Sequence, residues 1–74
     1  MLSLEVRYLL VQYEDRDQKM TAVAGQDCDS EATAITRAAE LRKRGLRIGI
    51  NKRVASSDRS DTYHLYGPDD ELPV

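Results

Sequence analysis

Apolar and polar residues alternate strictly near the start of the chain. Between residues 2 and 8 every second position is apolar, and the positions between them carry Ser3, Glu5 and Arg7. Neighbouring side chains of a strand point to opposite faces, so this period of two predicts a strand with one buried face. The side chains expected to point inward are Leu2, Leu4, Val6, Tyr8 and Leu10. Beyond Tyr8 the outer face also becomes apolar, which predicts a bulge or a cover on both sides of the strand end.

A second strand follows a short polar stretch. Residues 14–19 are polar or charged and lie between two strand-compatible runs, which predicts a hairpin loop. The next strand is expected over about residues 20–26. Two alanines on one of its faces, Ala22 and Ala24, indicate that another element packs closely on that side.

A helix-start signal follows the second strand. Asp29 or Ser30 can accept the free N–H groups of a first helical turn, and Glu31 complements the positive end of the helix dipole. The helix should end at Gly45, because glycine readily adopts the left-handed conformation of a helix cap. Steps of 100° per residue place one apolar stripe on this helix. The stripe consists of Ala34, Ile35, Ala38, Ala39 and Leu41. Because it is mostly alanine, we expect the helix to lie close against the strand that carries the two alanines.

Two further strands complete the pattern. Residues 46–54 alternate again, and residues 62–66 form a last short strand that stops before Gly67. The expected fold is α+β with the order ββαββ: a four-stranded, mainly antiparallel sheet with one helix packed on one face. Residues 1–67 would make a single α+β domain, and residues 68–74 an acidic, mobile C-terminal tail. The other sheet face has no second layer in this sequence, so a partner or a second copy would have to cover it.

The size and composition of the chain exclude several classes of protein. Its 74 residues allow one small domain with a limited core. A single cysteine excludes an intrachain disulfide, and one histidine with one cysteine offers no tetrahedral zinc set, so we expect no metal and no cofactor. The longest apolar run, residues 8–11, is too short to cross a bilayer, and the N-terminus has no secretory signal. A cytoplasmic location without a membrane partner is therefore expected.

Cys28 and His64 are the only pair that could supply a thiol nucleophile and a base. The sequence offers neither a third orienting group at a suggestive spacing nor a glycine-rich loop for an oxyanion. It also lacks a pair of carboxylates at a spacing typical of acid–base catalysis. We therefore expect no catalytic residue and a protein that acts by binding.

Positive charge is concentrated in one part of the chain. Residues 37–53 carry seven of the eleven basic residues and one acid, a net charge of +6, whereas the rest of the chain carries −8. Residues 42–44 lie in the last helical turn, where the helix dipole favours cations. The candidate partner-binding residues are five cations of the basic segment and two tyrosines that could add contact area. They are Arg37, Arg44, Arg47, Lys52, Arg53, Tyr13 and Tyr66.

The order of elements resembles that of small phage-encoded inhibitors of bacterial immunity, particularly type I anti-CRISPR proteins with a strand-strand-helix-strand-strand build. The segments that carry the resemblance are Leu4 to Val11, Asp27 to Glu31, Ala32 to Arg44, and Leu46 to Ile50. The resemblance implies a stoichiometric binder that blocks a nucleic-acid-handling complex by occupying a charged surface.

Three functions are compatible with these observations. The leading hypothesis is a non-enzymatic, phage-type inhibitor or adaptor that docks on a protein or a ribonucleoprotein. The second is a nucleic-acid-binding module that uses the basic segment 37–53, although four tyrosines without Phe or Trp and a pI near 5.3 argue against it. The third is a small homodimeric structural protein that closes its sheet face against itself. The acidic loops serve solubility, or they mimic phosphates in a basic groove of a partner.

Overall fold

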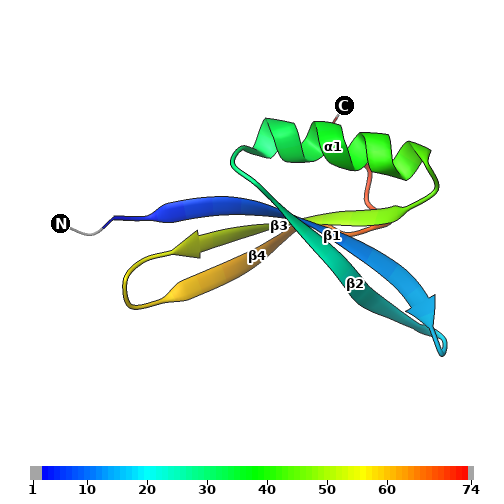
Figure 1. Ribbon diagram of the computed structural model, residues 1–74, viewed down its shortest axis with the longest axis horizontal. Coiled ribbons are helices and arrows are strands. Elements are labelled where there is room, and N and C mark those ends of the chain that lie inside the picture. Colours follow the sequence, from blue (N-terminus) through cyan, green and yellow to red (C-terminus); the bar gives the residue numbers. More distant parts are fainter. Residues whose placement is uncertain (1–2, 74) are drawn as a thin grey trace.

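The structure is a computed structural model that describes residues 3–73. Its elements are β1 (Glu5–Arg16), β2 (Lys19–Cys28), α1 (Glu31–Lys43), β3 (Arg47–Ala55) and β4 (Ser60–Tyr66). Within this range the strands form one sheet of order β2-β1-β3-β4, in which every neighbouring pair is antiparallel. The helix lies across one face of the sheet (Figure 1). The ββαββ fold of the α+β class, predicted from the alternation and the helix signals, is confirmed.

The first hairpin is tighter than the sequence predicts. Asp17 and Gln18 alone form its turn, with φ angles of 51° and 66°. Two successive positive φ angles match the right-handed twist of the flanking strands, so the charged residues around the turn extend the strands and do not form a loop. Strand β2 also continues to Cys28, two residues beyond its predicted end.

The helix begins and ends at the residues that the sequence indicates. Ser30 is the N-cap, and its Oγ accepts a hydrogen bond of 3.2 Å from the backbone N–H of Thr33. Gly45 follows the last turn with a φ of 88°, the left-handed conformation that ends many helices. Ala34 and Ala38 are fully buried, which lets the helix approach the sheet closely. The helix packs mainly on β3 and β1, and Ala22 and Ala24 of the edge strand β2 stay exposed, so their predicted role was wrong.

The buried core is small and lies between α1 and the middle of the sheet. Leu10 and Ile50 face each other across β1 and β3, and Ile48 and Ile50 are the largest fully buried side chains. The core consists of Leu10, Cys28, Ala34, Ala38, Ile48, Ile50 and Leu72. Two isoleucines and two alanines at its centre bury little apolar surface, so the stability of a single chain is expected to be low.

The helix covers only part of the sheet. In Figure 1 the first half of β1 and the β3–β4 hairpin extend well beyond the N-terminus of α1, and the β1–β2 hairpin extends away on the other side. The molecule is accordingly long and flat, measuring 44 × 29 × 16 Å. Leu4 and Val6, predicted to point inward, are 67% and 38% exposed, because the helix ends before it reaches them. Leu2 lies outside the described residues.

The segment after β4 packs against the domain. Leu72 is only 7% exposed and belongs to the core, although the acidic composition around it predicts a mobile tail. The backbone N–H of Gly67 donates to Asp70 Oδ2 at 2.7 Å, which closes a short turn after β4. Arg42 of the helix donates to the carbonyl oxygens of Gly67 and Asp70. In place of a mobile tail, residues 67–72 form a strap that is held by Arg42, by the buried Leu72 and by a salt bridge from Asp69 to Arg47.

Two glycines offer a local test of the packing. They lie on either side of Val11, Gly25 in β2 and Gly49 in β3. A Cβ on Gly49 would lie 2.8 Å from the backbone carbonyl oxygen of Tyr66. Because a paired backbone atom cannot move away cheaply, we expect Gly49→Ala to lower the free energy of unfolding by about 2 kcal/mol.

Gly25→Ala is the matched control for this substitution. A Cβ there would meet only the Leu10 carbonyl oxygen at 3.7 Å, an ordinary contact. We expect Gly25→Ala to leave the stability unchanged or slightly raised, because alanine restricts the unfolded chain more than glycine does. Urea denaturation followed by circular dichroism measures both variants, and equal transition midpoints for the two would contradict the packing described for Gly49.

Candidate interaction surfaces

The part of the helix-side sheet face that the helix leaves uncovered is apolar. Cross-strand pairing places Val6 opposite Val54, and Tyr8 opposite Lys52, which in turn faces Tyr63. Side chains that are paired across strands share a face of the sheet. We call this surface the apolar patch, made of Leu4, Val6, Tyr8, Lys52, Val54, Asp61 and Tyr63. Three of the four large hydrophobic side chains that are exposed within residues 3–73 lie on it.

The apolar patch carries two charged residues of opposite sign. Lys52 lies between Tyr8 and Tyr63, and Asp61 lies opposite Val54. Within residues 3–73 Lys52 makes no salt bridge, whereas Asp61 is paired with Arg59 over 3.4 Å. That pair is largely exposed and contributes little to stability. The net charge of the patch itself is therefore zero.

The opposite sheet face, which we call the open face, has no second layer among the described residues. Leu9, Val11 and Tyr13 of β1 form an apolar strip along its middle and are half-buried. Their neighbours on the same face are small or polar. These neighbours are Ala22, Gly25, Asp27, Arg47, Gly49, Asn51 and His64.

Two arginines face each other at one end of the open face. Arg7 of β1 pairs directly with Arg53 of β3. Within residues 3–73 neither of them forms a salt bridge, although Glu5 and Asp27 occupy nearby positions on the same face. Like charges directly opposite each other destabilise a sheet. Arg53 is among the candidate partner-binding residues and Arg7 is not; only the register of β1 and β3 reveals that the two face each other.

Arg47 is also on the open face, but its guanidinium is paired with two carboxylates of the same chain. Its guanidinium forms salt bridges with Asp15 at 3.1 Å and with Asp69 at 2.8 Å. These contacts tie the start of β3 to β1 and to the strap. Arg47 was predicted to contact a partner, and the structure gives it a partner inside the chain.

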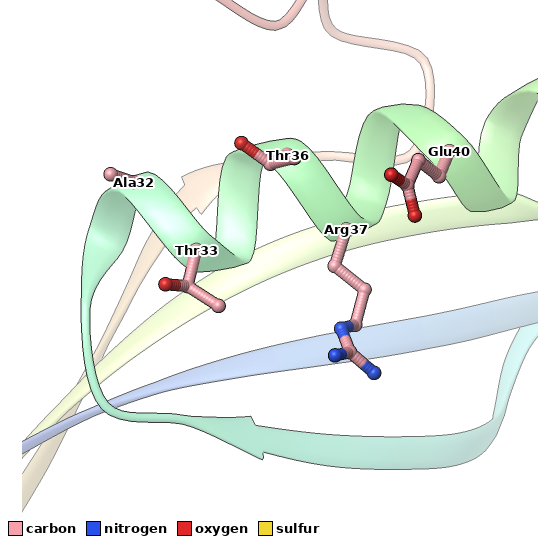
Figure 2. Close-up of a pocket in the computed structure, with 5 residues that line it drawn as sticks. All are labelled: Ala32, Thr33, Thr36, Arg37 and Glu40. Atoms are coloured by element: carbon pink, nitrogen blue, oxygen red, sulfur yellow. The ribbon is translucent and has the colours of Figure 1, made fainter.

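The remaining predicted cations are dispersed. Figure 2 shows Arg37 extending from α1 toward the strands, in a shallow hollow of about 310 Å³ lined by other residues of the helix. Arg37 and Arg7 also line a second hollow of about 280 Å³ at the end of β2. Arg44 is the exposed C-cap of the helix, and Lys52 lies on the apolar patch. The five predicted cations thus lie on the helix and on both faces of the sheet, and they form no single basic surface.

The two predicted tyrosines lie on opposite faces of the sheet. Tyr13 lies on the open face, close to Gly49, with its Cε2 atom 3.2 Å from the position of a Cβ there. Tyr66 pairs with Ile50 and packs against the core on the helix side. A bulge at Leu65 causes this, because a regular register would have placed Tyr66 beside Gly49 on the open face. The two tyrosines therefore cannot contribute to one contact surface on a single sheet face.

Arg42 has a structural role that the sequence analysis missed. Its Nε and Nη2 atoms donate to the Ile48 carbonyl oxygen at 3.0 and 2.7 Å, and Nη2 also donates to Gly67 at 2.9 Å. From the sequence, the position of Arg42 is accounted for by the helix dipole alone. A signal was present, because Arg42 follows Ala34 and Ala38 at intervals of four and therefore shares their buried face.

Cys28 and His64 are not brought together. Cys28 is buried in the core on the helix side, whereas the exposed His64 lies on the open face and its Nδ1 is 2.9 Å from Asn51 Oδ1. Within residues 3–73 no group of three histidine, cysteine or acidic side chains is arranged to hold a metal ion. The surface features that stand out are therefore the apolar patch and the arginine pair of the open face.

In the part of the chain that the structure describes, no helix combines the length and the apolar character needed to cross a membrane. No known protein family, curated protein or solved structure matches the chain.

Proposed function

We propose that the protein acts by binding and not by catalysis, as a small inhibitor or adaptor that docks on another protein through its open face. The observation that carries this proposal is the pair of arginines at one end of an uncovered apolar strip. Arg7 and Arg53 repel each other in the isolated chain, and a carboxylate-bearing surface would turn this repulsion into a charge-assisted contact.

The neighbouring residues suit a protein partner. Leu9 and Val11 lie beside the arginine pair and are half-buried without any cover. Protein interfaces combine an apolar centre with aromatic and arginine side chains, which is the composition of this strip together with Tyr13. Gly25, next to Val11, leaves room for the backbone or side chains of a partner.

Nucleic acid is less well supported as the partner. The basic segment 37–53 is divided between the helix and both sheet faces, and Arg47 is neutralised by two carboxylates. Glu5 and Asp27 border the arginine pair, and a phosphate backbone would approach them as closely as it approaches the arginines. The whole chain also carries a net charge of −2.

The proposed partner class rests on the resemblance of the element order to that of small phage-encoded inhibitors. That likeness supports a stoichiometric inhibitor of a nucleic-acid-handling complex, with the open face on an acidic protein surface of that complex. The complex could hold nucleic acid without the chain touching it. The proposal therefore concerns a protein surface, free or within a ribonucleoprotein.

A charge-reversal pair tests the open face. Immobilised chain is exposed to a nuclease-treated extract of the source cells, and the retained protein is purified and titrated by calorimetry. We expect Arg7→Glu/Arg53→Glu to weaken its binding by at least about thirtyfold, which corresponds to ~2 kcal/mol. The matched control is Arg16→Glu/Lys19→Glu, because these residues also face each other across two strands and their reversal changes the net charge equally.

Two results would count against the proposal. Equal weakening by both double variants would mean that net charge matters and the open face does not. Retention that disappears after nuclease treatment, together with direct binding to RNA or DNA that falls steeply with salt, would assign the protein to nucleic acid instead.

A further inference from the structure

The alternation of β1, β3 and β4 continues beyond the end of the helix. On the helix side of this region lie Val6, Val54 and Tyr63, whereas the open side carries Arg7, Arg53 and other polar residues. A sheet with one apolar and one polar face is typical of strands that cover something on the apolar side. Within residues 3–73 nothing covers this side, since Val6 is 38% and Tyr63 is 52% exposed.

The total surface of the chain is larger than its mass requires. The accessible surface is 5412 Å², whereas a compact monomer of 8.4 kDa exposes about 4,600 Å². The radius of gyration of 13.3 Å is likewise above the roughly 11 Å of a compact domain of this length. The excess of about 800 Å², taken over the whole elongated molecule, is of the size that one partner buries in a standard interface.

The charges of the apolar patch favour a second copy of the same chain as its occupant. An interface with two-fold symmetry places the same surface on both sides, so that surface must complement itself. The patch does so because it carries one charge of each sign. Lys52 has no salt bridge within the described residues, and Asp61, at the diagonal position on the next strand, has only an exposed salt bridge with Arg59. In a symmetric pair, each Lys52 can therefore face the Asp61 of the other copy. A strongly basic or acidic partner is less suitable, because the patch has no net charge to attract it.

We infer that two copies of the chain associate through their apolar patches, with Lys52 of each copy facing Asp61 of the other. The interface buries Leu4, Val6, Val54 and Tyr63 and completes the apolar face that the helix leaves uncovered. It lies on the opposite sheet face from the arginine pair, so this inference does not rest on the proposed function. A dimer would present two open faces to partners.

Sedimentation of the full chain over a wide range of concentrations tests the inference. We expect the wild-type protein to reach the mass of two chains and Val6→Lys/Tyr63→Lys to remain at the mass of one, with an unchanged circular dichroism spectrum. Met20→Lys is the matched control, because Met20 is 40% exposed and lies near the tip of the first hairpin, away from the patch. This control should still form the dimer.

A charge swap adds a second readout that does not depend on the apolar substitutions. Lys52→Asp should raise the dissociation constant of the dimer at least tenfold, and Lys52→Asp/Asp61→Lys should restore most of the loss. A wild-type chain that stays monomeric up to about 1 mM would overturn the inference. So would a dimer that survives Val6→Lys/Tyr63→Lys, or one that Met20→Lys disrupts equally.

Discussion

Replacing Arg42 by methionine is expected to lower the free energy of unfolding by about 3 kcal/mol. The guanidinium of Arg42 donates to the carbonyl oxygens of Ile48, Gly67 and Asp70, three acceptors from two segments that lie far apart in the sequence. Methionine keeps the stem of the side chain and leaves the part-buried carbonyl oxygens of Ile48 and Gly67 without this donor, which costs more than the bonds themselves contribute. A domain of this length has a total stability of about 4–11 kcal/mol, so the loss is a large fraction of the whole.

Two variants separate the hydrogen bonds from the charge. Arg42→Lys keeps the charge, but one ammonium group cannot reach all three acceptors. Its free energy of unfolding should therefore fall by more than half of the loss in Arg42→Met. Lys43→Met, at the next and exposed position, should stay within about 0.5 kcal/mol of the wild type. Urea denaturation at one fixed protein concentration gives all three values, because association would shift the midpoint. If Arg42→Met were as stable as Lys43→Met, the strap would not depend on Arg42.

Truncating Leu72 to alanine is expected to lower the free energy of unfolding by about 2–3 kcal/mol. Leu72 is 7% exposed and belongs to the same hydrophobic core as Leu10 and Ile48. Removing a buried leucine side chain loses its transfer free energy and leaves a cavity that the surroundings fill only in part. In a core this small, one missing leucine is a substantial loss of buried surface.

The neighbouring acid gives the control for the strap. Glu71 is exposed and has no salt bridge within residues 3–73, so Glu71→Ala should leave the midpoint of urea denaturation nearly unchanged. Hydrogen exchange of the Asp70 amide, which donates to the Gly67 carbonyl oxygen at 3.2 Å, should become faster in Leu72→Ala. Wild-type stability in Leu72→Ala would mean that residues 68–73 are the mobile tail that their composition predicts.

Local signals were sufficient to predict the elements and their order. The period of two in β1 and β3, the cap at Ser30 and the glycine at position 45 each act within a few residues, so they can be found without knowledge of the fold. The strap was missed for the opposite reason. Its acidic, proline-containing sequence is typical of a mobile end, and the features that hold it, Arg42 and the pocket for Leu72, belong to distant elements.

The candidate surfaces depended on register, which the sequence could not supply. The meeting of Arg7 with Arg53 requires the pairing of β1 with β3, and a single bulge at Leu65 moves Tyr66 to the other face. The apolar patch arose in another way. The alternation correctly placed Val6 on the helix side, but a helix of 13 residues is too short to cover the whole of a 12-residue strand.

This difference in length between α1 and β1 is the physical reason for proposing a dimer interface on the uncovered part of the sheet. A helix rises about 1.5 Å and a strand about 3.3 Å per residue, so α1 spans roughly half the length of β1. The apolar alternation nevertheless continues past the end of the helix, from Leu10 through Tyr8 to Val6. The uncovered half is therefore accounted for as an interface, and the open face remains free for a partner.

Isotope-filtered NMR on a mixture of labelled and unlabelled chains tests this claim most directly. The method reports only contacts between two different molecules, so the neighbours of Val54 and Tyr63 within one chain do not contribute. We predict cross-peaks from the methyl groups of Val6 and Val54 of one copy to the ring protons of Tyr63 of the other. The absence of any intermolecular cross-peak at near-millimolar concentration, or cross-peaks that arise only from Met20 or from Leu9 on the open face, would contradict it.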